Sequence, residues 1–556
     1  MQHRALSSVL VHVVFTLSFL GLSEAEPLRL GSVTFPNSGP AAAQEDFLRG
    51  VKYLHSFGFE EAAEAFQAAS KIAPDFALAY WGEALSHNHP LQPERDLASP
   101  RRVLARLGPR PAERVAKAPT AREAGLLEAV EILYGAGSAS ERSFAYSRAM
   151  GRLAAQYPDD EELQAFYAVA LLGTVRHIGE SWGAESTYRV RMQAGALAQA
   201  IFRNHPDHPG AAHYIIHAFD DPVHAPLALT AAERYAEIAP DASHALHMPS
   251  HIFIQHGMWD KVVASNDASY QAAIRLWHKR ADFSDTKRYF SDSSVWHALD
   301  WGQYGALQQA DYVKAKQALA LLRPVAAESQ VARVKEGVGL MAARYIVESE
   351  QWEKLAITET TTPAELLATG LSAIRLGDVA TAEQVEARLK SLTEEKQPLP
   401  RLEKSIAIMH KEIAALVRLA RGKSDEAIAL MQEATALAQD LGLPNGAAIP
   451  IKPGHELYGE ILLELGRPQE ATAQFETSLL RMPNRALSLR GSARAAAQSG
   501  DTETARQRYA QLVQIWESRG TPEVLQEARG FLKEQASRNK TAGQETDSLG
   551  AAPGGL

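Results

Sequence analysis

Residues 50–74 read GVKYLHSFGFEEAAEAFQAASKIAP, and this stretch carries the pattern of a two-helix hairpin. Small residues let paired helices approach closely, and aromatic residues fill the space between successive pairs. Proline ends a helix because it lacks an N–H donor and clashes with the preceding turn. The residues in these roles are, in chain order, Gly50, Tyr53, Ala62, Phe66, Ala69 and Pro74.

The same pattern recurs near the other end of the chain at a fixed period. The set Gly466, Ala471 and Phe475 is repeated, at one constant offset, by Gly500, Ala505 and Tyr509. Strand signals are nearly absent, because no long stretch alternates β-branched and polar residues. The sequence therefore predicts an all-α fold, a helical-hairpin solenoid in which each unit buries its face against its neighbours.

This pattern resembles the tetratricopeptide repeat (TPR), whose unit is about 34 residues long, and the constant offset in this chain matches that length. The chain further resembles a group of bacterial TPR-repeat proteins that carry the histidine motifs HYIIH, here residues 213–217, and HMPSHI, here residues 247–252. The resemblance spans most of residues 48–500. It implies a TPR-like solenoid with a right-handed superhelix, in which the first helix of each repeat lines a concave groove. The residues it implies to be functional are His213, His217, His244, His247 and His251.

Two pairs of histidines lie at equivalent positions of successive repeats. His213 and His217 are four residues apart, and so are His247 and His251, and the second pair follows the first by one repeat length. Residues four apart share one face of a helix, with Cβ atoms about 5–6 Å apart. Equivalent helices of stacked repeats lie about 8–10 Å apart. This spacing predicts a metal site in the concave groove, made by these four histidines, with His244 on the same face.

Residues next to the two histidine pairs are expected to shape the helix that carries the second pair and to supply carboxylates to the site. Pro249 interrupts the helix between His247 and His251 and is expected to kink it. Carboxylates could complete a mixed site or orient a ligand through its other ring nitrogen. The candidates are Asp220, Asp221 and Asp241.

The other histidines of this region are given different roles. Nine of the 19 histidines fall between His205 and His256. His205 and His208 are expected in a solvated loop beside prolines, and His256 at a helix C-terminus. His224, in a turn, is left open. His55 and His89, which are also one repeat length apart, are expected to line the groove, and so is His455 in PGHELYGE.

Composition limits the chemistry that is available. The chain has 556 residues, too many for one compact core. Its net charge of −9 is spread along the chain, which excludes nucleic acid as an expected partner. Cysteine is absent, so disulfides, iron–sulfur clusters and thiolate zinc sites are excluded. A metal site must use His, Asp or Glu.

The chain divides into four predicted segments. Residues 1–25 have a short basic start, an apolar run and a Ser-Glu-Ala stop, which are typical of a secretory signal peptide. Residues 26–350 are predicted to form a TPR solenoid with the histidine cluster, residues 351–536 a second solenoid, and residues 537–556 a disordered tail. We expect a secreted or periplasmic protein with no membrane span in the mature chain.

Two functions remain open at this point. One is a metal-dependent oxidoreductase or hydrolase that acts on a small organic substrate, with copper, zinc or iron as the transition metal ion. The alternative is a non-catalytic scaffold whose concave groove binds a peptide or protein partner. No catalytic residue is assigned by the sequence. Bound metal would separate the two functions.

Overall fold

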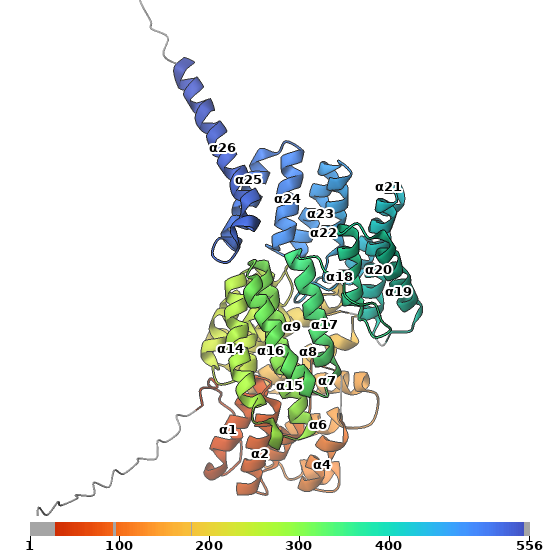
Figure 1. The fold of residues 1–556 in the computed structure, drawn as a ribbon. Coiled ribbons are helices and arrows are strands. Elements are labelled where there is room, and N and C mark those ends of the chain that lie inside the picture. The colour runs from red at the N-terminus through yellow and green to blue at the C-terminus, as the bar shows by residue number, and fades with distance from the viewer. Residues whose placement is uncertain (1–27, 93–95, 180, 398, 550–556) are drawn as a thin grey trace, which may run out of the picture.

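The computed structural model describes residues 28–92, 96–179, 181–397 and 399–549 (Figure 1). These residues are largely helical, and the β structure among them is one isolated bridge between Gly183 and Leu443. The prediction of an all-α fold is confirmed. The predicted signal segment, residues 1–25, lies outside the described residues, so export stays a prediction. None of the described helices is both long enough and apolar enough to span a membrane.

The helices follow one another along the chain in short-linked pairs. In the first part they are α1 (Ala41–His55), α2 (Phe59–Ile72), α3 (Ala77–Leu85), α4 (Ala98–Leu107), α5 (Pro111–Val115), α6 (Ala121–Leu133), α7 (Ala139–Gln156), α8 (Glu161–Thr174), η1 (Val175–His177), α9 (Glu185–Asn204), α10 (Pro209–Ala218), η2 (Ala225–Ala228), α11 (Leu229–Ile238), α12 (Ser243–His247) and α13 (Pro249–Gln255). They continue as α14 (Trp259–Trp277), η3 (Arg280–Asp282), α15 (Asp285–Gln308), α16 (Tyr312–Glu328), α17 (Ala332–Ser349), α18 (Pro363–Arg375), α19 (Val379–Glu394), α20 (Pro400–Ala420), α21 (Ser424–Asp440), α22 (Gly454–Glu464), α23 (Pro468–Arg481), α24 (Ala486–Gln498), α25 (Thr502–Trp516) and α26 (Pro522–Leu549).

The close approach of helices depends on the small residues that define the repeat. Phe66 of α2 is fully buried between Gly50 of α1 and Gly82 of α3. A methyl group on Gly50 would lie 2.8 Å from the Phe66 ring, and one on Gly82 would lie 2.4 Å from it. Since real contacts of this kind are longer, only glycine fits at both positions. The predicted roles of small and aromatic residues are confirmed here.

The same arrangement occurs near the other end of the chain. Phe475 of α23 packs between Gly459 of α22 and Gly491 of α24. Methyl groups at these two glycines would lie 2.8 Å and 2.1 Å from the Phe475 ring. Because helices next to each other in the chain also make most of the inter-helix contacts, the fold is a TPR-like helical-hairpin solenoid.

The later repeats pack back onto the earlier ones. Residues 350–362 form no helix, at the place where the sequence puts the boundary between two solenoids, and that division stays a prediction. The side chain of Trp259 donates to the carbonyl oxygen of Asn484 over 3.0 Å, and Trp516 donates to that of Gln308 over 2.9 Å. Figure 1 shows α22 to α24 next to the ends of α14 to α17.

The last helix differs from the sequence prediction. α26 continues to Leu549, so residues 537–549 are helical where the sequence predicts a disordered tail. Alanine, glutamate, glutamine and lysine recur between residues 533 and 545, and these residues favour a helix. In Figure 1 this helix projects away from the other repeats. Residues 550–556 lie outside the described residues.

A buried arginine joins the early and late repeats. Arg485, with 0% of its surface exposed, donates from Nη1 to Glu348 over 2.7 Å. Its Nε and Nη2 atoms donate to the two carboxylate oxygens of Glu456 over 2.7 and 3.0 Å. Glu348 and Glu456 are also buried, so one guanidinium group compensates two carboxylates that water cannot reach.

We predict that Arg485→Ala lowers the free energy of unfolding by about 3–5 kcal/mol, because it leaves buried carboxylates without their counter-charge. Urea unfolding followed by circular dichroism measures this change. The matched control is Arg494→Ala, since Arg494 forms an exposed ion pair with Glu527, 2.6 Å long. An exposed pair contributes about 0–1 kcal/mol. Equal losses in the two variants would contradict the proposed role of Arg485.

Candidate metal centre

Six histidines from neighbouring helices come together in two groups of three. Within each group the candidate ligand atoms lie within 4.8 Å of one another. The first group is His213, His217 and His244, and the second group is His247, His251 and His297. The structure thus brings together all five histidines that the sequence singled out, divides them between two groups, and adds His297 from α15.

The two groups form one continuous cluster, called here the histidine chamber. The rings of His217 and His251 have centroids 5.8 Å apart, and those of His244 and His247 are 6.1 Å apart. Helix α12 ends at His247 and α13 begins at Pro249, as the sequence predicts for this proline. The chamber therefore extends over two successive first helices, α10 and α12–α13, and over α15 behind them.

Hydrogen bonds fix the orientation of two rings in the second group. His251 bonds through Nδ1 to Asp220 Oδ2 over 2.7 Å, as the sequence analysis expects of a carboxylate partner. His247 bonds through Nδ1 to Asn266 Oδ1 over 2.7 Å. Asn266 donates its own Nδ2 to the carbonyl oxygen of Val262, so its oxygen is the atom that faces His247. Both acceptors are oxygens, hence both Nδ1 atoms carry the proton.

The remaining nitrogens of these two rings face each other. His247 Nε2 lies 3.0 Å from His251 Nε2. With the protons on Nδ1, both Nε2 atoms present lone pairs, and two lone pairs do not form a hydrogen bond. Either a second proton or a cation must lie between them. Ligand nitrogens about 3.3 Å apart are what a tetrahedral ion with bonds of about 2.0–2.1 Å requires.

The first group shows a related arrangement. His213 donates from Nδ1 to the carbonyl oxygen of His55 over 2.6 Å, which leaves its Nε2 without a proton. That Nε2 lies 3.2 Å from His244 Nε2. His217 Nε2 is buried and has no hydrogen-bond partner among the described residues. The Nε2 atoms of His213 and His217 are therefore available to one ion, and that of His244 joins them when its ring carries the proton on Nδ1.

Burial keeps the imidazoles of the chamber neutral. Desolvation, followed by repulsion from neighbouring rings, lowers the pKa of His213 and of His247 from 6.5 to about 3. The same causes hold the pKa values of His217, His244 and His297 well below the ordinary value. Neutral imidazole is the form that binds a metal ion, so these five rings are ready to act as ligands at pH 7.

Phe57 covers the first group. Its ring centroid lies 4.3 Å from that of His213 and 5.6 Å from those of His217 and His244. The backbone of Phe57 has a φ of 52°, a left-handed conformation that a bulky residue rarely adopts. The equivalent turn of a later hairpin has Gly257, with a φ of 62°. A phenylalanine at a turn position suited to glycine costs about 1–2 kcal/mol.

Tryptophans cover the rest of the chamber. The Trp301 ring lies 4.3 Å from His251 and 5.1 Å from His247, measured between centroids. Trp182 lies 6.2 Å from His217 at a steep angle. These aromatic walls limit the access of water and so strengthen electrostatic interactions inside the chamber.

A third group of possible ligands lies beside the chamber. His55 Nε2 is 2.9 Å from Glu162 Oε2, and His208 Nε2 is 3.3 Å from Glu162 Oε1. All three residues are buried. Burial raises the pKa of Glu162, but the attraction of the two histidines and their hydrogen bonds outweigh it and lower that pKa to about 2. The prediction of a solvated loop position for His208 is wrong, because its loop packs onto α1 and α8.

The other predicted residues lie outside the chamber. His205 is exposed, and His256 caps the C-terminus of α13, so both of these predictions are confirmed. Asp221 is used by Arg191 and by His224, over 2.7 and 2.8 Å. Asp241 accepts from the backbone of Arg29. Of the three candidate carboxylates, only Asp220 contacts a chamber histidine in the hydrogen bonds of the described residues.

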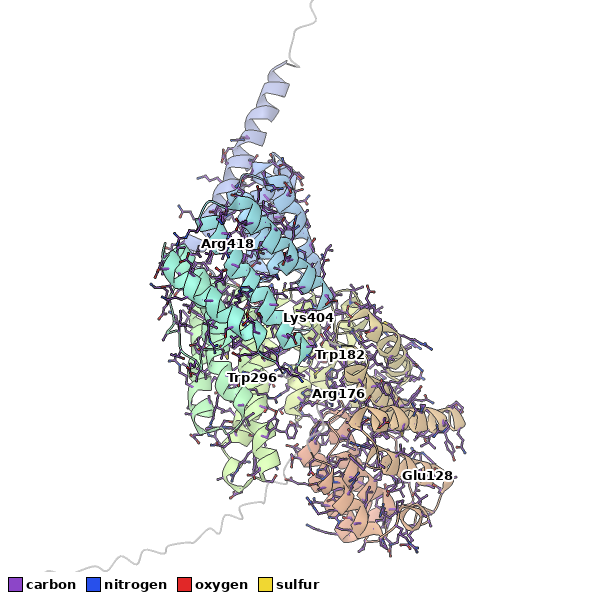
Figure 2. The ribbon with its side chains drawn as sticks, turned by 90° about the vertical axis from the view of Figure 1, so that its right-hand side faces the viewer. Glu128, Arg176, Trp182, Trp296, Lys404 and Arg418 are labelled. Atoms are coloured by element: carbon purple, nitrogen blue, oxygen red, sulfur yellow. The ribbon has the colours of Figure 1, made fainter. Side chains whose placement is uncertain are left out.

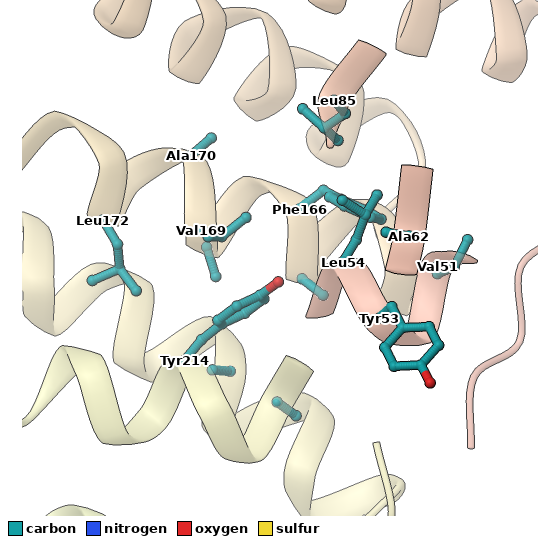
Figure 3. Packing of buried hydrophobic residues seen from close by; sticks show 14 of the residues in the cluster. Val51, Tyr53, Leu54, Ala62, Leu85, Phe166, Val169, Ala170, Leu172 and Tyr214 are labelled. Atoms are coloured by element: carbon teal, nitrogen blue, oxygen red, sulfur yellow. The ribbon is translucent and has the colours of Figure 1, made fainter. Parts of the chain in front are cut away.

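A cavity that is partly open to solvent lies on the other side of Phe57. Figure 3 shows part of its wall, where Leu54, Phe166 and Val169 surround the hydroxyl end of Tyr214. His89, which the sequence analysis expects to line the groove, lines this cavity instead of the chamber, and so does His87. Since Phe57 contacts both spaces, a ligand in the cavity would lie one side chain from the first group.

The lowered pKa values predict how the metal-free protein responds to pH. Because His213 and His247 titrate near pH 3 when folded but near 6.5 when unfolded, the unfolded chain binds more protons between these values. The free energy of unfolding should therefore fall as pH drops below about 6.5, by up to about 1.4 kcal/mol per pH unit for each histidine. Urea unfolding between pH 7 and 5 measures this slope. The double variant His213→Asn, His247→Asn should make the slope shallower, and His217, His244 and His297 maintain the remainder. A wild-type stability that does not change over this range would contradict the prediction.

No protein-family model matches the chain, and no curated protein matches it either. Solved structures of helical-repeat proteins are similar to it. The human IFIT1 dimer with m7Gppp-AAAA is 13% identical over 87% of this chain and 91% of that chain, with a TM-score of 0.33. Yeast Tom70 is 12% identical over 90% and 89%, with a TM-score of 0.28. The TPR domain of P58(IPK) is 16% identical over 67% and 99%, with a TM-score of 0.20. Similarity at this level carries no argument, and the fold assignment rests on the hairpins of this chain.

Proposed function

We propose that this chain is a TPR-like metalloprotein that binds two transition metal ions in the histidine chamber, one in each group of three histidines. The proposal extends the single four-histidine site that the sequence analysis predicts, because the structure separates these residues into two sets. It also gives His297 the role of a ligand. The rings of the two groups are close enough for both ions to act on one small molecule.

The observation that carries the proposal is the pair of facing nitrogens in His247 and His251. Their Nδ1 atoms are held by oxygens of Asn266 and Asp220, so their Nε2 atoms meet as lone pairs 3.0 Å apart. A second proton on His247 is disfavoured because burial lowers its pKa to about 3, which leaves His251 as the ring that an added proton would have to occupy. A metal ion bound by both nitrogens satisfies both lone pairs and needs no added proton.

The ligand type narrows the choice of metal. Three neutral imidazoles suit copper, zinc or iron, whereas magnesium, calcium and manganese prefer carboxylate, carbonyl and water oxygens. The carboxylate nearest to the rings, Asp220, is bonded to Nδ1 of His251 and so orients that ligand without replacing it. Copper, zinc and iron therefore remain the candidates.

An ion held by three histidines keeps an open position, through which it can activate water or polarise a substrate. This favours a metal-dependent oxidoreductase or hydrolase with a small organic substrate. The cavity behind Phe57 combines apolar walls with polar side chains such as His87, Asn88 and Tyr134, and it is where such a substrate would bind. The alternative, a groove that binds a peptide, has less support, because His213 and His247 are 0% and 2% exposed and a peptide could not reach their side chains.

We predict that untagged protein, reconstituted with copper or zinc and desalted, retains two ions per chain. His297→Ala should reduce the content to one ion, because only the second group loses a ligand. Elemental analysis with a protein assay measures the ratio. The control is His278→Ala, which removes an exposed histidine at the end of α14 and should leave two ions. A wild-type chain that retains no metal would refute the proposal, and equal content in the His297→Ala and wild-type proteins would refute the role of His297.

We also predict that Asp220→Asn weakens metal binding about 10–100-fold while the solenoid stays folded, because the amide no longer supplies the charge that orients His251. Competition with a coloured chelator measures the affinity. Asp207→Asn is the matched control, since Asp207 forms an exposed ion pair with Arg234. Unchanged affinity in Asp220→Asn would show that this carboxylate does not support a ligand.

A further inference from the structure

A second pocket, partly open to solvent, lies on the far side of Trp182 from the histidine chamber. The early and late repeats both contribute to its wall. Ser181 donates to the carbonyl oxygen of Leu441, and Gly183 pairs with Leu443, so the two parts of the wall are joined directly. Figure 2 shows Trp182 where the N-terminal helices meet the C-terminal ones, close to the start of α20. We call this space the arginine pocket.

Two arginines give the pocket its positive charge. Arg401 and Arg481 line it, and no aspartate or glutamate of the described residues does. Arg481 donates from Nη2 to the carbonyl oxygen of Ala438 over 2.9 Å and to that of Gly442 over 2.5 Å. No hydrogen bond or ion pair is made by the Arg401 side chain to the part of the chain that the structure describes. Burial lowers the pKa of both guanidinium groups, which shows that their charge lacks compensation.

A histidine adds a polar atom that has no partner. His455 is 5% exposed and bonds through Nδ1 to Gln474 Oε1 over 2.8 Å. Its Nε2 is buried in the pocket wall and finds no hydrogen-bond partner among the described residues. His455 also lies in the first turn of α22, whose N-terminus carries the positive end of the helix dipole. A buried polar atom of this kind needs a hydrogen-bond partner, and a ligand in the pocket can supply it.

The rest of the wall is mainly apolar, with Ser181, Asn445 and Ser478 as its other polar side chains. The apolar part is formed by Trp182, Ala438, Leu441, Leu443, Ala448, Ile449 and Met482, with prolines between them. Apolar walls with a few convergent polar groups are typical of sites for small organic molecules. Guanidinium groups recognise carboxylate and phosphate oxygens through paired N–H donors. The ligand that fits this pocket therefore has a carboxylate or phosphate group attached to an apolar part.

We propose that the arginine pocket binds a small organic acid whose carboxylate lies between Arg401 and Arg481 and whose apolar part packs against Trp182. A carboxylate fits better than a phosphate dianion, because Arg481 Nη2 already donates to two backbone carbonyl oxygens and few N–H donors remain for the additional phosphate oxygens. His455 Nε2 accepts a hydrogen bond from a hydroxyl group next to the carboxylate. None of the six chamber histidines lines the pocket, so the proposal does not depend on metal binding.

The experiment uses the full chain after metal removal with EDTA, and mandelate as the probe, because it combines a phenyl ring, a hydroxyl group and a carboxylate. Isothermal titration calorimetry should show one mandelate per chain. Mandelamide, its neutral counterpart, should bind at least ten-fold more weakly. Arg401→Met should weaken mandelate binding at least ten-fold, whereas Arg401→Lys, which keeps the charge, should lose less.

The control is Arg421→Met, the same substitution at the opposite end of α20, where the arginine is exposed and pairs with Glu383. It should bind mandelate like the wild type, and circular dichroism confirms that all variants are folded. Equal binding of mandelate and mandelamide, wild-type affinity in Arg401→Met, or no binding of mandelate would overturn the proposal. Tighter binding of phenyl phosphate than of mandelate would overturn the assignment of a carboxylate.

Discussion

The close approach of α1 to α10 is the constraint on which the metal centre depends. Gly210 opens α10, and a methyl group there would lie 2.4 Å from Nδ1 of His55. With glycine in place, the carbonyl oxygen of His55 reaches His213 and fixes which of its nitrogens carries the proton. A larger residue at Gly210 would separate the helices and release that ring. The close contact between Gly210 and His55 thus determines which nitrogen of His213 is free to bind a metal ion.

Electrostatics explains how these histidines can lie so close together. Charged imidazoles in such contact would repel one another and would lose their hydration, so His213, His217, His244, His247 and His297 are held neutral. Neutral rings with the outer nitrogen fixed present inner lone pairs, and these pairs repel as well unless a cation lies among them. Asp220 contributes a negative charge to the second group, which favours a cation there. The buried, closely spaced histidines therefore raise the free energy of the folded protein without metal, and a bound ion would lower it.

Much of the fold and most of the chamber histidines could be predicted from the sequence. In a repeat protein, residues one repeat length apart lie at equivalent positions of stacked helices. The constant repeat period placed His213, His217, His247 and His251 on stacked helices, and the structure confirms the all-α fold. His297 could not be predicted, since it lies on α15, outside the period of the two motifs, and reaches the chamber only through the packing of α15 behind α12. A lone histidine without a repeat partner gives no signal of this kind.

The division of the histidines into two groups of three could not be predicted from the sequence either. Stacked helices predict that rings are near one another, but which nitrogen faces which depends on acceptors brought from elsewhere, such as Asn266 on α14 and the carbonyl oxygen of His55 on α1. For His208 the sequence prediction was wrong. The flanking prolines suggested a solvated loop, whereas the loop packs against Glu162. Contacts between distant segments decide these cases, and local patterns do not encode them.

The most direct test of the two-ion centre is a crystal structure of the reconstituted protein with anomalous diffraction recorded at the absorption edge of the metal. The account predicts two anomalous peaks per chain. One should be bonded to His213, His217 and His244, and the other to His247, His251 and His297. A single peak shared by histidines of both groups, or no peak within the chamber, would contradict it.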